Sequence, residues 1–433
     1  MNQFSIDVSW LPETNGAAEE RLTAASLTIS VGDWTPTRID DSWSKSVHNS
    51  TRVSAYPLAL WLASSWWRLR WESAPIRSIP DISWKMSHAM PAAGGGYLWP
   101  NLTFESDGDQ IFVVCRPSNP LANEPIRYLE NFQAVIPASL FQSEIDAFIR
   151  LTLARLDAVR LSSTPLHEIW SEVLGERHAA EVAYLRGLEA RLGFDPSEAP
   201  EDLLQRMSLL AGVAGSEALE EIAAACAGSR FELTFRQITE FAALPGTTAR
   251  IPRQVGGSLG NTGGQLPWHL GRQLAQDLRR SFDLGQGPIR DDQLAGILEI
   301  PVQRLREAQG LRPRSPVGLA IRLNGGDSLK LLFRKHNRPG LRFEAARFLA
   351  EQALVPAAET WLPATDSKSS RQKIQRSFAA EFLCPIETLT DFLDGDYSPE
   401  LVEEAAERFG VSELAVETQL VNHGLLSHEQ ALF

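Results

Sequence analysis

The sequence predicts an α+β fold with three parts: a tryptophan-rich mixed α/β region, a central helical region, and a C-terminal region that combines a small sheet with helices. Nine of the twelve tryptophans lie before residue 100. Apolar residues recur at helical spacing between residues 143 and 158. Two short apolar runs, 317–323 and 328–333, flank the turn-forming sequence Asn-Gly-Gly-Asp, which is typical of a β-hairpin.

Length and composition indicate a globular protein with more than one domain. A chain of 433 residues can bury ample core in two or three domains. The net charge of −13 disfavours a protein that binds nucleic acid or anionic membranes over its whole surface. Three scattered cysteines indicate a reducing compartment, and no apolar run approaches the length of a membrane span. Without a signal-peptide pattern, we expect a cytoplasmic protein with no membrane partner.

Residues 1–137 are expected to form the mixed α/β domain, with strands near 4–10, 25–31, 111–115 and 132–136 and a helix at 56–67. Within that helix and just after it lies a group of indoles and guanidinium groups: Trp61, Trp66, Trp67, Arg68, Arg70 and Trp71. A packed aromatic core or seam is the favoured interpretation, because tryptophan buries a large area. The alternative is an exposed aromatic–arginine surface for a partner protein or stacked bases.

Residues 138–243 are expected to form a helical domain. Pro165 fits the first turn of a further helix in this region. Between residues 168 and 221 there are twelve acidic side chains against four arginines. This imbalance indicates a solvated acidic face, or alternatively a docking face for a basic partner.

Residues 244–267 are rich in glycine and are expected to form a linker or mobile loop before the last domain, 268–433. From residue 230 to 338 the chain carries seventeen Lys and Arg against nine Asp and Glu. The favoured interpretation is that this basic stretch faces the acidic helical region. Binding of nucleic-acid phosphates is the alternative, and such binding would depend strongly on salt.

The sequence Arg-Phe-Glu-Ala-Ala-Arg-Phe-Leu-Ala-Glu at 342–351 resembles the metal-binding helix of the ImmA/IrrE metallopeptidase family, whose pattern is R-F-t-x-A-H-E-x-x-H. Arg342, Phe343 and Ala346 match that pattern. Downstream, the Phe-Ala-Ala sequence at 378–380 and a closing proline match the second helix of the family. The resemblance covers about residues 265–426 and implies a zincin-like fold for the last domain.

The resemblance also implies which positions would hold zinc, and these are altered. In H-E-x-x-H the two histidines bind zinc and the glutamate is the general base, but this chain has Arg347, Phe348 and Glu351 there. The acidic third-ligand position of the family is Ile374. Arginine offers a metal no lone pair, and elsewhere no two histidines lie four residues apart. We therefore expect no zinc or other cofactor and no catalytic residue.

The altered residues suit a filled pocket. Arg347 and Glu351 lie one turn apart and could form an ion pair, while Phe348 and Ile374 would fill the space of the base and the third ligand. We expect a non-catalytic regulatory, sensor or adaptor protein that binds a protein or peptide. The resemblance implies a setting in phage defence, mobile-element control or stress response. The alternatives are an active metallopeptidase with an atypical metal site that cleaves a regulator, and a DNA-binding regulator.

Overall fold

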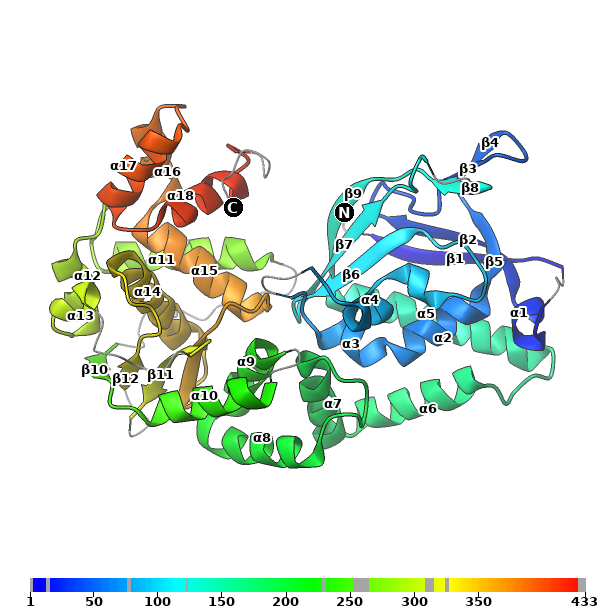
Figure 1. The fold of residues 1–433 in the computed structure, drawn as a ribbon, viewed down its shortest axis with the longest axis horizontal. Helices are drawn as coiled ribbons and strands as arrows, with labels where there is room; N and C mark the ends of the chain where they lie inside the picture. The colour runs from blue at the N-terminus through cyan, green and yellow to red at the C-terminus, as the bar shows by residue number, and fades with distance from the viewer. Residues whose placement is uncertain are drawn as a thin grey trace. The chain divides into compact units, whose positions relative to one another are not determined.

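The computed structural model describes residues 3–12, 16–75, 79–121, 124–227, 231–251, 265–307, 315–323 and 327–426. They belong to two compact units, Met1–Pro200 and Glu201–Phe433 (Figure 1). Helices predominate, and the described strands form small antiparallel sheets. The predicted α+β class is therefore confirmed. In the part of the chain described, no helix combines the length and apolar character that crossing a membrane requires.

The described strands of the first unit form sheets in the orders β1-β2-β5, β4-β3-β8 and β6-β7-β9. The strands are β1 (Phe4–Trp10), β2 (Ala24–Val31), β3 (Ile39–Asp41), β4 (Ser46–His48), β5 (Thr51–Ser54), β6 (Asn101–Ser106), β7 (Gln110–Arg116), β8 (Ile126–Tyr128) and β9 (Phe132–Pro137). Along β2, Leu27, Ile29 and Val31 are buried at alternate positions, as in a strand with one face on a core. The four predicted strands are β1, β2, β7 and β9, and these predictions are confirmed.

The helices of the first unit pack on these strands and on one another. They are α1 (Ala18–Leu22), α2 (Ala55–Ser64), α3 (Trp66–Trp71), α4 (Ile82–His88), the short 3-10 helix η1 (Met90–Ala93), α5 (Ala138–Ala158), α6 (Pro165–His178) and α7 (Ala180–Leu192). The helix predicted at 56–67 is two helices, α2 and α3, which meet at Ser65 (φ −92°, ψ 4°). The long α5 packs against both β1 and α2 (Figure 1).

The second unit contains a four-stranded antiparallel sheet in the order β10-β12-β11-β13. Its strands are β10 (Thr247–Arg250), β11 (Gly318–Arg322), β12 (Ser328–Leu332) and β13 (Trp361–Ala364). The two predicted hairpin strands are β11 and β12, which pair with Leu319 opposite Leu332. That prediction is confirmed for the strands, while the predicted turn at 324–326 lies outside the described residues.

The helices of the second unit pack on this sheet and on one another. They are α8 (Glu201–Ala214), α9 (Ser216–Cys226), α10 (Phe231–Ala243), α11 (Pro267–Ser281), α12 (Asp291–Leu298), α13 (Gln303–Arg306), α14 (Arg338–Leu354), α15 (Ser370–Leu383), α16 (Ile386–Leu393), α17 (Pro399–Phe409) and α18 (Glu413–Asn422). The crossing of α11 and α15 is very close, because a Cβ on Gly271 would lie 2.4 Å from the carbonyl oxygen of Ile374. Helix α14 packs against α15, β13 and β11.

The boundary between the two units lies inside the region predicted as one helical domain. Helices α5 to α7 belong to the first unit, whereas α8 to α10 belong to the second, where α9 packs against β13. The stretch expected as a linker also contains regular structure, because β10 pairs with β12 across the register Thr247 to Leu331. The rest of that expected loop, 252–264, lies outside the described residues.

Candidate functional site

Helix α14 carries three of the four altered positions, and its environment decides what they can do. The helix begins at an N-cap, where the side chain of Asn337 accepts a hydrogen bond from the backbone N–H of Gly340 at 2.9 Å. From Leu341 to Gln352 nearly every side chain is buried, including two arginines and two glutamates. Buried charges must be paired or hydrogen-bonded, so each of these side chains should have identifiable partners.

Arg347 is buried and bonded to neutral oxygens. Its Nε donates to Oε1 of Gln375 at 3.1 Å, and its Nη2 donates to the backbone oxygen of Thr365 at 2.6 Å. The side-chain oxygen of Gln372 also accepts from Nη2. Burial, together with the nearby guanidinium groups of Arg376 and Arg334, lowers the pKa of Arg347 to about 9. Arg347 is therefore still a cation at neutral pH, at the position where the family pattern has a metal ligand.

Glu351 is fully buried, and both of its oxygens are engaged by Arg371 of α15. Nε of Arg371 donates to Oε1 at 2.8 Å, and Nη2 donates to Oε2 at 2.6 Å. The side-chain amide of Gln375 also donates to Oε1. Burial opposes the charge on Arg371, but the carboxylates of Glu351, Glu221 and Glu217 outweigh that effect and raise its pKa.

The expected ion pair between Arg347 and Glu351 is therefore wrong. No ion pair joins these two described residues, and Glu351 pairs with Arg371 instead. Gln375 lies between them, because it accepts from Arg347 through its oxygen and donates to Glu351 through its nitrogen. The cause is the neighbouring helix α15, whose Arg371 makes two charge-assisted hydrogen bonds to Glu351, whereas Arg347 in the preceding turn of α14 bonds to other groups.

Phe348 and Ile374, which were both expected to fill the pocket, differ in their burial. Phe348 has no exposed surface and packs in the core, with its ring centre 5.7 Å from that of Phe333. Ile374 is only partly buried and lies where α15 crosses α11 at Gly271. Successive residues of a helix point about 100° apart. The position of α15 that bonds to Arg347 and Glu351 is the next one, Gln375, and the space-filling role of Ile374 stays a prediction.

The side chains of this network do not fit a zinc ion. Zinc in proteins is bound by thiolates, imidazoles and carboxylates, whereas Arg347 and Phe348 offer no such donor. Both oxygens of the one carboxylate, Glu351, already accept hydrogen bonds from a guanidinium group. Among the described residues, no three His, Cys, Asp or Glu side chains are grouped so that they could hold a metal ion.

The network continues from α15 to helix α9. Nη1 of Arg371 lies 3.5 Å from a carboxylate oxygen of Glu217, and the hydroxyl of Ser369 donates to Glu221 at 2.6 Å. Burial raises the pKa of Glu221, and Arg371 only partly opposes this effect. The pKa of Glu217 is raised for the same main reason. The candidate site is therefore a continuous polar network on α14, α15 and α9, which is buried or partly buried except at Glu217.

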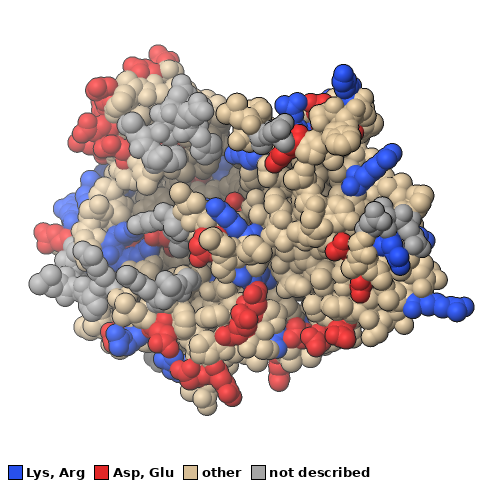
Figure 2. All heavy atoms as spheres, turned by 45° about the vertical axis from the view of Figure 1, so that its right-hand side comes forward, with Lys and Arg blue, Asp and Glu red and all other residues tan. Residues whose placement is uncertain are grey.

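The basic stretch 230–338 is largely bonded within the second unit. Arg334 pairs with Glu344 at 3.0 Å and with Asp366 at 2.6 Å, and Arg338 pairs with Asp291 at 3.0 Å. These acidic partners lie outside the acidic helical region that was expected to face the stretch. On the molecular face shown in Figure 2, basic and acidic side chains are interspersed. Internal pairing is thus the interpretation that the contacts support, with different partners from those expected.

The aromatic–arginine group of the first unit is mostly inaccessible. Trp61, Trp66, Trp67 and Arg68 are buried, whereas Arg70 and Trp71 are partly buried. The indole nitrogen of Trp61 donates to the backbone oxygen of Met86 at 2.7 Å, and that of Trp67 donates to Glu176 at 2.8 Å. The partner-surface alternative is wrong for the four buried side chains, and the polar groups of Trp61, Trp67 and Arg68 are bonded inside the unit. The core interpretation holds for them.

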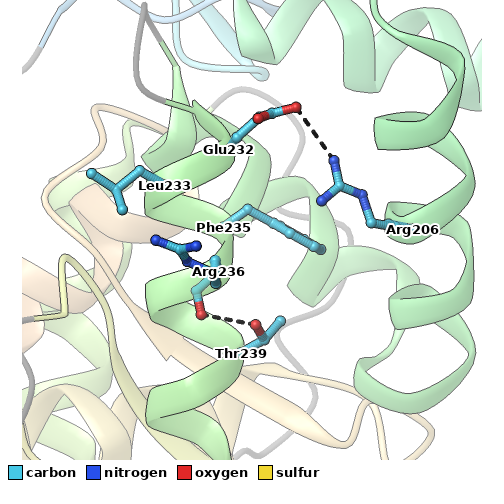
Figure 3. A pocket seen from close by; sticks show the side chains of 6 residues that line it. All are labelled: Arg206, Glu232, Leu233, Phe235, Arg236 and Thr239. Carbon is cyan, nitrogen blue, oxygen red and sulfur yellow. Dashed lines mark hydrogen bonds and ion pairs between the residues drawn. The ribbon is translucent and has the colours of Figure 1, made fainter.

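A pocket of about 350 Å³ that the sequence did not indicate lies between α8 and α10. Figure 3 shows its lining side chains: Arg206, Glu232, Leu233, Phe235, Arg236 and Thr239. Its two arginines already have acidic neighbours, since Arg206 lies 3.0 Å from Asp202 and Arg236 lies 3.9 Å from Glu240. The pocket therefore offers no strong unpaired charge to a ligand.

Arg371, Gln372 and Gln375, which complete the network, were not predicted from the sequence. One signal was available: Gln372 and Gln375 lie three residues apart, so they share a helix face. Gln375 and the buried Phe378 are likewise three residues apart, which places polar side chains on the core side of α15. Buried amides in that position need partners, and α14 supplies them.

No family model, curated protein or solved structure matches the chain. The likeness to ImmA/IrrE peptidases remains a prediction that rests on the quoted residues. The function must accordingly be inferred from the chemistry of the side chains in place.

Proposed function

We propose that this chain is a non-catalytic, peptidase-like protein that binds a protein partner or peptide and acts as a regulator, sensor or adaptor. The observation that carries the proposal is the bidentate bond of Arg371 to Glu351, with Arg347 close by. A metallopeptidase needs side chains that donate lone pairs to its metal and a base that can reach water. The corresponding positions hold a cation, a buried phenyl ring and a carboxylate whose oxygens are both engaged.

The buried network supports a structural role for the former catalytic helix. A polar network in a low-dielectric interior stabilises one arrangement only when every member has a partner. Arg347, Glu351, Gln372 and Gln375 each have at least one hydrogen-bond partner. We propose that the helix pair α14–α15 now acts as a rigid support for surfaces that bind partners, in phage defence, mobile-element control or stress response.

We further propose a cytoplasmic location. Cys115, Cys226 and Cys384 are all unpaired and buried. Burial raises the pKa of Cys226 to about 12, so its thiol stays protonated and unreactive at neutral pH. Free thiols of this kind are usual in a reducing compartment.

The proposal is tested with the purified full-length chain and an unfolded protein substrate, assayed with and without a metal chelator. We expect no cleavage under either condition. A control variant carries Arg347→His, Phe348→Glu and Glu351→His together, which restores the family motif on α14. Cleavage by the natural chain that is abolished by the chelator would show an active metallopeptidase and would overturn the proposal.

A further inference from the structure

Helix α9 is attached to the segment that leads into β13. The carboxylate of Glu359 accepts from the backbone N–H groups of Ala218 at 3.0 Å and Glu217 at 3.3 Å, at the first turn of α9. A carboxylate in this place is favoured by the helix dipole. The approach requires Gly215, where a Cβ would lie 2.0 Å from Glu359 at a φ of +105°. The backbone N–H of Thr360 also donates to Ala214, at 2.9 Å.

The strand beside this attachment is the last in its sheet. β13 ends the order β10-β12-β11-β13, and α9 packs against it. A terminal strand carries backbone groups that do not pair within its own sheet and can accept an extended segment of another chain. In β13 the backbone oxygen of Pro363 already accepts hydrogen bonds from Gln372 and Gln375 of α15. Helix α9 packs against the same strand, so its docking is one of two helix contacts that hold β13.

Further along α9, the side chain of Glu221 bonds to Ser369 at the start of α15, in an unusual environment for a carboxylate. Glu221 is 7% exposed, and its bond to the hydroxyl of Ser369 is 2.6 Å long. No ion pair joins Glu221 to a cation among the described residues, because Arg371 directs its groups to Glu351 and Glu217. The ionisable groups around Glu221 are Arg371 and Arg376 of α15, Glu351 of α14, and Glu217 of α9 itself.

These contacts predict that the docking of α9 depends on pH. Burial is the largest influence on Glu221, and it raises the pKa of that carboxyl above its usual value, with Glu351 adding to the effect. The docked state consequently holds the proton of Glu221 to a higher pH than the undocked state does. By linkage, the contribution of Glu221 to the docking free energy is fully present at acidic pH and is lost as the pH rises through the raised pKa.

We propose that α9 is a latch on β13, which protonation of Glu221 tightens and ionisation of Glu221 loosens. Glu359 and Thr360 form the hinge side of the latch. The carboxylate of Glu359 accepts from backbone N–H groups in the first turn of α9, and the N–H of Thr360 donates to the backbone oxygen of Ala214 in α8. Ser369 and Glu221 form the side that opens. The latch is a device beyond partner binding as such, and it does not depend on whether the chain has lost catalysis.

Hydrogen–deuterium exchange of the full-length chain tests the latch. Rates are expressed as protection factors, so that the intrinsic pH dependence of exchange cancels. We expect the protection of the α9 amides to fall several-fold between about pH 5 and about pH 8, while that of α17 stays constant. In the Glu221→Gln variant, which keeps an acceptor for Ser369, α9 should be better protected at the higher pH and nearly independent of pH.

The matched control is Glu403→Gln, at an exposed position of α17. It should leave the pH dependence of α9 as it is in the natural chain. If Glu221→Gln does not fold, the pH profile of the natural chain decides alone. Protection of α9 that is constant or rises with pH overturns the proposal, and so does a folded Glu221→Gln variant with the pH dependence of the natural chain.

Discussion

Arg342 has no exposed surface, although arginine is among the residues least often buried. Its Nε donates to the backbone oxygen of Gly410 at 2.9 Å, its Nη2 donates to that of Ile289 at 2.6 Å, and Nη1 bonds to Asp291. These bonds tie α14 to the end of α17 and to the start of α12. One of the residues that carries the family resemblance therefore connects three helices.

We expect Arg342→Met to destabilise the second unit by about 3–5 kcal/mol, because it leaves buried carbonyl groups and part of a buried charge unpaired. Arg306→Met removes another partner of Asp291, but Arg306 is 58% exposed and should contribute only about 0–1 kcal/mol. Urea unfolding of both variants measures the difference. Equal losses of stability in the two variants would show that burial of Arg342 is not what matters.

Asp366 gives a prediction of pH dependence at the same scale. Burial opposes its ionisation, but hydrogen bonds from Arg334 outweigh burial and lower the pKa of Asp366 to about 2. For a lowered carboxyl pKa, the stabilisation is present above the ordinary pKa and is lost as the pH falls through the lowered one.

The natural chain should therefore lose stability between about pH 4 and about pH 2, and Asp366→Asn should lose less over that interval. Urea midpoints measured across this range test the expectation. A variant with the same acid loss as the natural chain would exclude Asp366 as a source of it.

At the scale of elements, the close crossing of α11 and α15 depends on the lack of a side chain at Gly271. Gly271→Ala places a Cβ 2.4 Å from a backbone oxygen of α15 and 2.8 Å from the next contact, so a helix must shift. We expect a loss of about 1–3 kcal/mol. The control is Gly296→Ala in α12, where a Cβ meets nothing within 4 Å. This change should be neutral or stabilising by up to about 1 kcal/mol. A neutral Gly271→Ala would mean that the helices cross less closely.

Local sequence patterns predicted several individual strands, but they did not predict which other elements and side chains contact them. The apolar runs at β11 and β12 and the alternating strands of the first unit are encoded in neighbouring residues, and these were found. Strand β10 was missed because its four residues pair with β12, about eighty residues further along the chain. The altered positions on α14 were found by pattern as well. Their true partners, Arg371 and Gln375, depend on how α15 packs, which no local spacing reveals.

At the scale of the whole molecule, each unit has its own apolar core. One buried cluster includes Trp61 and Trp67 with residues of α5 and α6, and the other surrounds Phe348 and Phe378. The first cluster extends past residue 137, where the sequence predicted a domain boundary, and its described members reach Ala190.

We therefore expect a fragment of residues 1–200 to fold alone, and a fragment of residues 1–137 to remain unfolded, since it lacks α5, which covers β1 and α2. Tryptophan fluorescence and circular dichroism of the two fragments report this directly. A cooperative unfolding transition in the shorter fragment would restore the boundary at residue 137.

The most direct test of the central claim is the zinc and iron content of the purified full-length chain, measured before and after incubation with excess zinc and dialysis. With Arg371 occupying both oxygens of Glu351, we expect far less than about one metal ion per chain, and no change in the Glu351→Ala variant. A stoichiometry of about one ion that is lost in Glu351→Ala would contradict the account, because it would mean that Glu351 binds a metal in place of Arg371.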